Sequence, residues 1–140
     1  MKSLEEALQH HSEKFIAMLR RLDRYGALEQ PDGYGSKKGI CGDTVEFFLS
    51  VHDGIIQMVT FELDGCFHTT ACANAVTLIA EGRKVADSWE ITPESIIDYL
   101  ETLPEDHHHC AELVIGAFYL ALANYHELQR QPWKKSYSRR

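Results

Sequence analysis

The stretch from Cys41 to Cys66 reads CGDTVEFFLSVHDGIIQMVTFELDGC, and it decides the fold. Apolar residues recur at every second position on both sides of Asp53-Gly54, which is the period of a β-strand. Asp-Gly is typical of a tight turn, because glycine adopts positive φ without steric cost. The pattern therefore predicts an antiparallel hairpin that carries a cysteine at each end.

Two registers are compatible with this hairpin. A two-residue loop sets Phe47 against Thr60, whereas a three-residue loop sets Phe47 against Val59 and matches the apolar faces. We favour the three-residue loop. In either register the strand ends meet, so Cys41 and Cys66 are expected within one residue of each other across the ladder. Two thiols presented in this way make half of a metal site.

Composition limits the class of protein. With 140 residues and 44% hydrophobic content, the chain is expected to form one domain over residues 1–140. The net charge is −7 and basic residues gather in a tail at 131–140, so the body is acidic, which argues against a nucleic-acid partner. No apolar run approaches the ~20 residues that span a bilayer, and no apolar signal core opens the chain. We therefore expect a cytoplasmic protein without a membrane partner, in which four cysteines favour metal or redox chemistry over disulfides.

Before the hairpin, a helix is predicted over residues 1–26, opened by a capping box at Ser3 and Glu6. Its apolar stripe comprises Leu4, Leu8, Phe15, Leu19 and Leu22. Residues 27–39 are a loop by composition, with room for one irregular strand. The second face of the hairpin carries Phe48, Ile56 and Met58, either as a second buried face or as a patch for a partner.

After the hairpin the pattern turns helical. Thr69 or Thr70 is expected to cap a helix that ends before Gly82, with Ala71, Ala75, Leu78 and Ile79 as its buried stripe. Thr92-Pro93 is expected to begin another helix, and residues 106–132 are expected to form the last and longest one. Strands come first and helices mostly afterwards. The predicted class is α+β, with a small antiparallel sheet packed against helices.

Three cysteines are expected at helix beginnings: Cys66 just before a helix, Cys72 in its first turn, and Cys110 at the start of the last helix. Helix N-termini stabilise thiolate over thiol, and thiolate is the form that binds soft metals. Three cysteines in such places indicate a metal or redox site rather than small buried hydrophobes.

Two other residues are candidates for a fourth ligand. His109 precedes Cys110, and Asp43 follows Cys41 by two positions. The neighbouring His107 and His108 are interpreted as solvated or as supporting groups outside the ligand set. The spacing matches neither a zinc ribbon nor a ferredoxin, so spacing alone identifies no known site.

Taken together, these motifs resemble the NifU/IscU-type iron–sulfur cluster assembly scaffolds. The matching motifs are Cys41-Gly42-Asp43, Gly65-Cys66, the small-residue helix ending at Gly82, Leu103-Pro104, and His109-Cys110-Ala111-x-Leu113. The resemblance covers about residues 36–126. It implies an α+β sandwich in which Cys41, Cys66 and Cys110 hold the cluster or a persulfide, with Asp43 and His109 as accessory ligands.

By this resemblance the protein is a scaffold and not an enzyme. It would assemble a transient [2Fe–2S] cluster from an iron donor and from sulfur delivered by a cysteine desulfurase, and pass the cluster to apo-acceptor proteins. Zinc would bind at the same residues. The family's chaperone motif is degenerate here, since its second proline and its lysine are replaced at Glu105 and His107.

The chain departs from the family in a second way, because Cys72 adds a thiol near the site. Two other functions therefore stay open. One is a sulfurtransferase-like persulfide relay that uses Cys72 or Cys110 as the acceptor. The other is a structural zinc domain that mediates protein contacts.

Overall fold

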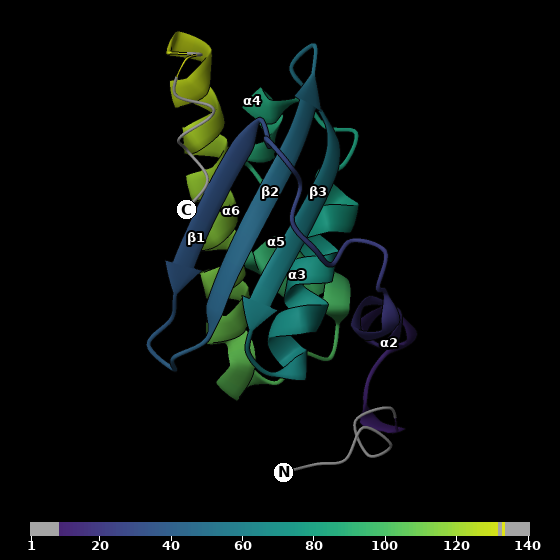
Figure 1. The fold of residues 1–140 in the computed structure, drawn as a ribbon. Coiled ribbons are helices and arrows are strands. Elements are labelled where there is room, and N and C mark those ends of the chain that lie inside the picture. Colours follow the sequence, from purple (N-terminus) through teal and green to yellow (C-terminus); the bar gives the residue numbers. More distant parts are fainter. Residues whose placement is uncertain (1–8, 132, 134–140) are drawn as a thin grey trace.

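The sheet has three antiparallel strands in the order β1-β2-β3, in a computed structural model that describes residues 9–131 and 133 (Figure 1). The strands are β1 (Gly33–Lys38), β2 (Thr44–His52) and β3 (Ile55–Asp64). The helices are α2 (Glu13–Arg20), α3 (Phe67–Ala80), α4 (Val85–Ser88), α5 (Pro93–Leu100) and α6 (His108–Arg130), with a 3-10 turn η1 (Glu105–His107) before α6. The predicted α+β class is confirmed. In the described part of the chain, no helix is both long and apolar enough to span a bilayer.

The core lies between one face of the sheet and the helices behind it (Figure 1). Helix α6 packs on β1 and β2, α3 packs beside it behind β3, and α2 and α5 pack against α3. Phe47, Phe61 and Phe118 are fully buried in this core. The opposite face of the sheet is buried at Phe48, which packs against Tyr34 with ring centroids 5.2 Å apart. Of the three residues that the sequence left as a buried face or a patch for a partner, Phe48 and Ile56 are buried within this chain and Met58 is partly exposed.

The tip of the β2–β3 hairpin is a two-residue turn, so the favoured three-residue loop is wrong. His52 pairs with Ile55, and the intervening Asp53 and Gly54 both have positive φ, at 52° and 74°. Two positive φ values give the turn a twist that matches the twist of the strands it joins. Aspartate is one of the residues that tolerate the left-handed region beside glycine, which explains why the shorter loop forms.

Beyond the tip, a register shift at Ser50/Val51 corrects both predicted registers. A bulge adds one residue to β3, so that Phe47 pairs with Phe61 and Val45 with Leu63. Without the bulge, the two-residue turn would set Phe47 against Thr60. The extra residue therefore matches the apolar faces of the two strands, which a one-residue slip would otherwise separate.

Strand β1 lies within the stretch assigned to a loop by composition. It pairs with β2 from Gly33 opposite Leu49 to Lys38 opposite Thr44. A Cβ on Gly33 would lie 2.6 Å from the carbonyl oxygen of Ala121 in α6, and a Cβ on Gly35 would clash with the same helix. The glycines are thus where the backbone of α6 rests directly on the strand. The strand shows no apolar alternation, because the backbone of α6 occupies the space that side chains on the inward face would need.

The N-terminal helix is shorter than predicted. The chain leaves the helical conformation at His11, and α2 begins after Ser12, whose hydroxyl accepts a 3.1 Å hydrogen bond from the Phe15 N–H. Helix α2 ends at Arg20, so Leu22 lies beyond it and is 80% exposed instead of buried. The predicted capping box at Ser3 and Glu6 lies outside the described residues.

Helix α3 begins earlier than predicted. Its N-cap is Cys66 and not a threonine, and Cys72 therefore lies in the second turn rather than the first. Ten of the 14 residues of this helix are buried, whereas Leu78, expected in the buried stripe, is 42% exposed. A helix packed on several sides needs small residues such as Ala71 and Ala75, so the composition of α3 reflects close packing and not a single stripe.

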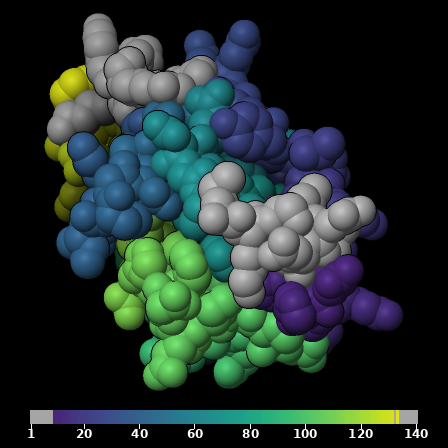
Figure 2. Space-filling model, turned by 90° about the horizontal axis from the view of Figure 1, so that it is seen from below, coloured from purple at the N-terminus to yellow at the C-terminus, as the bar shows by residue number. Residues whose placement is uncertain are grey.

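Five element ends meet at one end of the molecule, the lower end in Figure 1. They are the end of β1, the beginning of β2, the end of β3 and the beginnings of α3 and α6. Figure 2 looks at this end, where the blue chain around residue 40 lies beside the green beginning of α6. All four cysteines belong to segments that begin or end in this region, which makes it the place to search for a site.

Candidate metal centre

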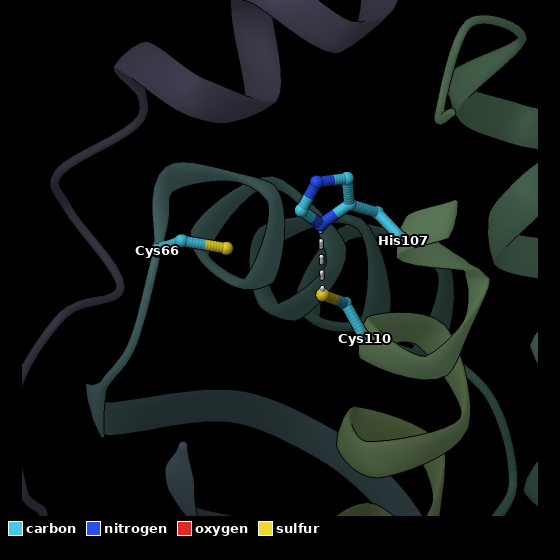
Figure 3. Close-up of side chains that lie close together, drawn as sticks. All are labelled: Cys66, His107 and Cys110. Atoms are coloured by element: carbon cyan, nitrogen blue, oxygen red, sulfur yellow. Dashed lines mark hydrogen bonds between the residues drawn. The ribbon is translucent and has the colours of Figure 1, made fainter. Parts of the chain in front are cut away.

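Three donor side chains come together at this end: Cys66, His107 and Cys110 (Figure 3). The two sulfurs and one ring nitrogen of the imidazole all lie within 4.8 Å of one another. Cys66 comes from the beginning of α3, whereas His107 and Cys110 come from η1 and the first turn of α6. Cys66 and Cys110 both lie at helix beginnings, as expected, whereas Cys41 is not a member of this group.

Cys66 is the thiolate of the group. A hydrogen bond from the Cys110 thiol lowers the pKa of Cys66, and contacts with His68 and with the N–H and hydroxyl of Thr69 lower it further. Burial acts in the opposite direction but is outweighed. Cys66 is the N-cap of α3, and the backbone N–H of Thr69 in the first turn contributes to the lowered pKa, as expected for a helix N-terminus.

The other two buried thiols stay protonated. The pKa of Cys110 is raised because its thiol donates to the Cys66 sulfur, and burial adds to this effect. The pKa of Cys72 is raised by its burial and then by the negative charge on Cys66. Cys72 is fully buried in the core beside the site and is not a member of the donor group. This agrees with the expectation of an extra thiol near the site.

His107 is a donor that the sequence analysis did not assign to the ligand set. Its Nδ1 lies 3.9 Å from the Cys110 sulfur, and its ring stacks on His68 with centroids 3.7 Å apart and an interplanar angle of 15°. His107 precedes Cys110 by three positions, the spacing that places two side chains on the same side of a helix. That spacing could have indicated His107, whereas adjacency to Cys110 favoured His109.

Asp43 reaches the site through a hydroxyl. Thr69 donates a 2.9 Å hydrogen bond to Oδ2 of Asp43, and the same hydroxyl oxygen lies 3.6 Å from the Cys66 sulfur. A Cβ on Gly65 would lie 2.6 Å from that carboxylate oxygen. The role of Gly65 is therefore to leave room for the Asp43 side chain.

Cys41 and His109 lie on a neighbouring pocket of about 180 Å³. Lys37, Lys38, Glu112 and residues of the β1–β2 turn complete its wall. Cys41 is exposed on this turn and is outside the group of three donors, while Nε2 of His109 lies 3.7 Å from the Cys110 sulfur. Cys110 therefore lies between two sets of side chains: His109, which lines the pocket, and the inner group formed by Cys66 and His107 with Cys110 itself. Convergence of Cys41, Asp43, Cys66, His109 and Cys110 on one ion stays a prediction.

The inner group fits a soft cation. Thiolate sulfur and imidazole nitrogen are the ligands that zinc and iron prefer in tetrahedral sites. Cys66 and His107 are partly exposed, and Cys110 closes the group from the protein side. An ion bound here would keep one side open to solvent, which suits exchange of cargo better than permanent storage.

A small antiparallel sheet backed by helices, with soft donors gathered at one open end, defines an α+β domain with a thiolate–imidazole site. The chain belongs to the family described as the NifU-like N terminal domain, whose model matches residues 11–132. The resemblance proposed from the motifs is confirmed.

Relatives of known name agree with this assignment. The iron-sulfur cluster assembly scaffold protein IscU 1 of Archaeoglobus fulgidus is 27% identical over 116 residues, which cover 82% of this chain and 76% of the relative. IscU of Aquifex aeolicus, also named as a scaffold protein, is 25% identical over 118 residues, or 82% and 75% of the two chains. These relatives are named as scaffolds and not as enzymes.

Structural comparison supports the same fold. The crystal structure of a nitrogen-fixing NifU-like protein (N-terminal) from Brucella abortus superposes with a TM-score of 0.68 at 16% identity. The match covers 83% of this chain and 94% of that structure. The sheet order and the helices behind it are therefore those of the family.

Proposed function

We propose that this protein is a scaffold on which an iron–sulfur cluster is assembled and from which it is passed to acceptor proteins. The observation that carries the proposal is the Cys66 thiolate beside Cys110 and His107 at an open end of a NifU-like domain. A thiolate that exists at neutral pH can receive iron or sulfur without first losing a proton. The names of the IscU relatives support the same role.

The finer assignment follows the family motifs. We propose a transient [2Fe–2S] cluster held by Cys41, Cys66 and Cys110, with Asp43 and His109 as accessory ligands. Cys41 stands on an exposed turn between Gly39 and Gly42, and Gly42 has a φ of 92°, so this turn is the element that would bring the third thiolate to the cluster. A carboxylate is a hard ligand and binds cluster iron less firmly than a thiolate, which would favour release.

The proposed partners are a cysteine desulfurase, an iron donor and apo-acceptor proteins, with any chaperone reading a degenerate motif at residues 103–107. We place the protein in the cytoplasm, where thiols stay reduced. All four cysteines are free in the structure, which agrees with a reducing compartment.

Anaerobic reconstitution tests the proposal. The parent protein is incubated with ferrous iron and a sulfide source, then visible absorption, iron and acid-labile sulfide are measured. We expect two irons and two sulfides per cluster in the parent, loss of the cluster in Cys66→Ser, and retention in Cys72→Ala, whose thiol is buried outside the donor group. A parent that takes up no sulfide under these conditions contradicts the proposal.

The two alternatives predict different products. A persulfide relay would collect sulfur without iron, and a structural zinc domain would hold one zinc that resists exchange. Relay through Cys72 or Cys110 has less support, because the raised pKa of each thiol leaves it protonated and a poor nucleophile.

A further inference from the structure

We infer that before any cluster is built this chain holds a single soft divalent cation, zinc or iron(II), through Cys66, His107 and Cys110, with Cys41 outside the coordination shell. The inference rests on the proposed function and specifies how the same site binds its first ion. The inference differs from the family motifs in one ligand: the His107 imidazole binds the ion, where the motifs would use Cys41 or His109.

The distances support a nearly formed site. Zinc–sulfur bonds of ~2.3 Å and zinc–nitrogen bonds of ~2.0 Å in a tetrahedron put the donor atoms roughly 3.5–3.8 Å apart. The Cys110 sulfur and Nδ1 of His107 are 3.9 Å apart, and both lie within 4.8 Å of the Cys66 sulfur. The donors must therefore close by no more than roughly 1 Å to coordinate an ion, a movement that side-chain rotation supplies.

The His107 ring is held in its orientation by other rings. It stacks on His68, and His68 in turn stacks on Phe67 with centroids 4.1 Å apart. His68 is almost fully buried, and its Nδ1 contacts the Cys66 sulfur at 3.7 Å. His68 does not belong to the donor group, so its role is to position His107 and Cys66. Ligands oriented by such neighbours lose less freedom when they bind.

The pocket that holds Cys41 is less suited to a first cation. Lys37 and Lys38 line it against one carboxylate, Glu112, so it carries an excess of positive charge. The inner group instead offers two sulfurs and an imidazole, with the Asp43 carboxylate one hydroxyl away from the Cys66 sulfur. Coulomb attraction therefore directs a dication to the inner group and leaves Cys41 and His109 unused at this stage.

Zinc and cobalt(II) are the probes for the test. The affinity of the full-length protein for zinc is measured by competition with a chelator, and the ligand set by X-ray absorption. We expect two sulfurs and imidazole nitrogen around the metal in the parent. His107→Ala should weaken zinc binding roughly 100-fold, because loss of even an orienting residue costs 10–100-fold. His126→Ala is the matched control, since His126 is an exposed histidine of α6 outside the donor group, and zinc affinity should stay within about twofold.

His68 and a replacement donor sharpen the test. His68→Phe keeps a ring to stack on and should retain zinc affinity within about threefold, whereas His68→Ala should lose about tenfold with the ligand set unchanged. His107→Cys should restore binding and give a three-sulfur spectrum, which excludes misfolding as the cause of the alanine result.

Two results would overturn the inference. One is a three-sulfur shell in the parent, and the other is Cys41→Ser weakening zinc binding as much as His107→Ala. Failure of the proposed function is a separate outcome: a parent that holds zinc through these three donors yet never accumulates sulfide overturns the scaffold role alone. A parent that builds a cluster but binds its first ion through Cys41 overturns the inference alone.

Discussion

The four cysteines of this chain are all free, yet they differ in environment and protonation. Cys41 is exposed, Cys66 is a thiolate at the beginning of α3, and Cys72 and Cys110 are buried thiols. The sequence alone places each cysteine near the end of an element but does not rank the reactivity of the four thiols. The ranking depends on which thiol donates a hydrogen bond to which sulfur, because that bond shifts the pKa of both partners.

Alkylation of metal-free protein tests the state of Cys66. Because its pKa is lowered, Cys66 stays a thiolate as the pH falls, and its rate of reaction with iodoacetamide should be nearly flat from pH 8 to 6. An ordinary thiol with a pKa of about 8.5 slows about tenfold per pH unit over the lower part of this range. Peptide mass spectrometry follows each site, with glutathione as the control. A tenfold decline per unit at Cys66 would contradict the assignment.

Asp43→Ala is expected to hold an assembled cluster longer than the parent. The proposed role of Asp43 is that of a hard, labile ligand. Its removal takes away negative charge beside the cysteines and frees the Thr69 hydroxyl to donate to the Cys66 sulfur. Cluster half-life in air, followed by visible absorption, measures the effect, and Asp64→Ala on the exposed end of β3 is the control. Equal or faster loss in the mutant would show that Asp43 only satisfies donors in its turn.

The group of three donors shows how far sequence reasoning reaches at the residue scale. The position of Cys66 and Cys110 at helix beginnings could be predicted, because helix beginnings are readable from capping and turn residues. His107 was not, because His107, His108 and His109 are chemically identical and differ only in direction. The direction is fixed by the 3-10 turn η1, whose side-chain geometry depends on packing against His68.

Among the elements, β1 shows most clearly what local pattern cannot reveal. A strand of the sequence GYGSKK carries no apolar period, and its pairing becomes favourable only because α6, more than 70 residues later in the chain, covers its glycines. The bulge in β3 has a similar origin, since it satisfies both the turn at the tip and the apolar match along the strands. By contrast, α5 was predicted from Thr92, whose side chain caps the helix as expected.

Gly35→Ala should destabilise the protein strongly. A Cβ at this position meets the backbone of Ala117, Leu120 and Ala121, and backbone cannot move aside as a flexible side chain would. Overpacking of this kind costs about 1–3 kcal/mol or more of unfolding free energy. Urea unfolding gives the value, and Ser36→Ala on the exposed part of the same strand should change it by less than about 0.5 kcal/mol. Equal effects for the two variants would mean that α6 does not rest on β1.

For the molecule as a whole, binding of an ion at the site is linked to the unfolding free energy. The donors come from two separate helices, so a bound ion joins them and binds only the folded chain. Zinc at 100 times its dissociation constant should add about 2.7 kcal/mol to the unfolding free energy. The gain should shrink as the pH falls from 8 to 5, because the metal must displace the proton that the raised pKa keeps on Cys110. Thermal unfolding with and without zinc at pH 8 and pH 5 measures it; an equal gain at both values would exclude a thiolate–histidine site.

The single domain over residues 1–140 stays a prediction, since the described residues stop short of both ends of the printed sequence. Within residues 9–131, the element order, the sheet and the site all belong to one packed unit around one core. Limited proteolysis of the full chain would give the boundaries directly.

The position of Cys110 in the first turn of α6 has a consequence during synthesis on the ribosome. Cys66 leaves the exit tunnel well before Cys110, and its helix then lacks the long helix that packs beside it. Domains fold as units once enough chain has emerged, so until α6 docks the nascent protein carries Cys41, Cys66 and Cys72 without Cys110. Cys66 and Cys110 can therefore bind an ion together only after the last helix of the chain has been synthesised.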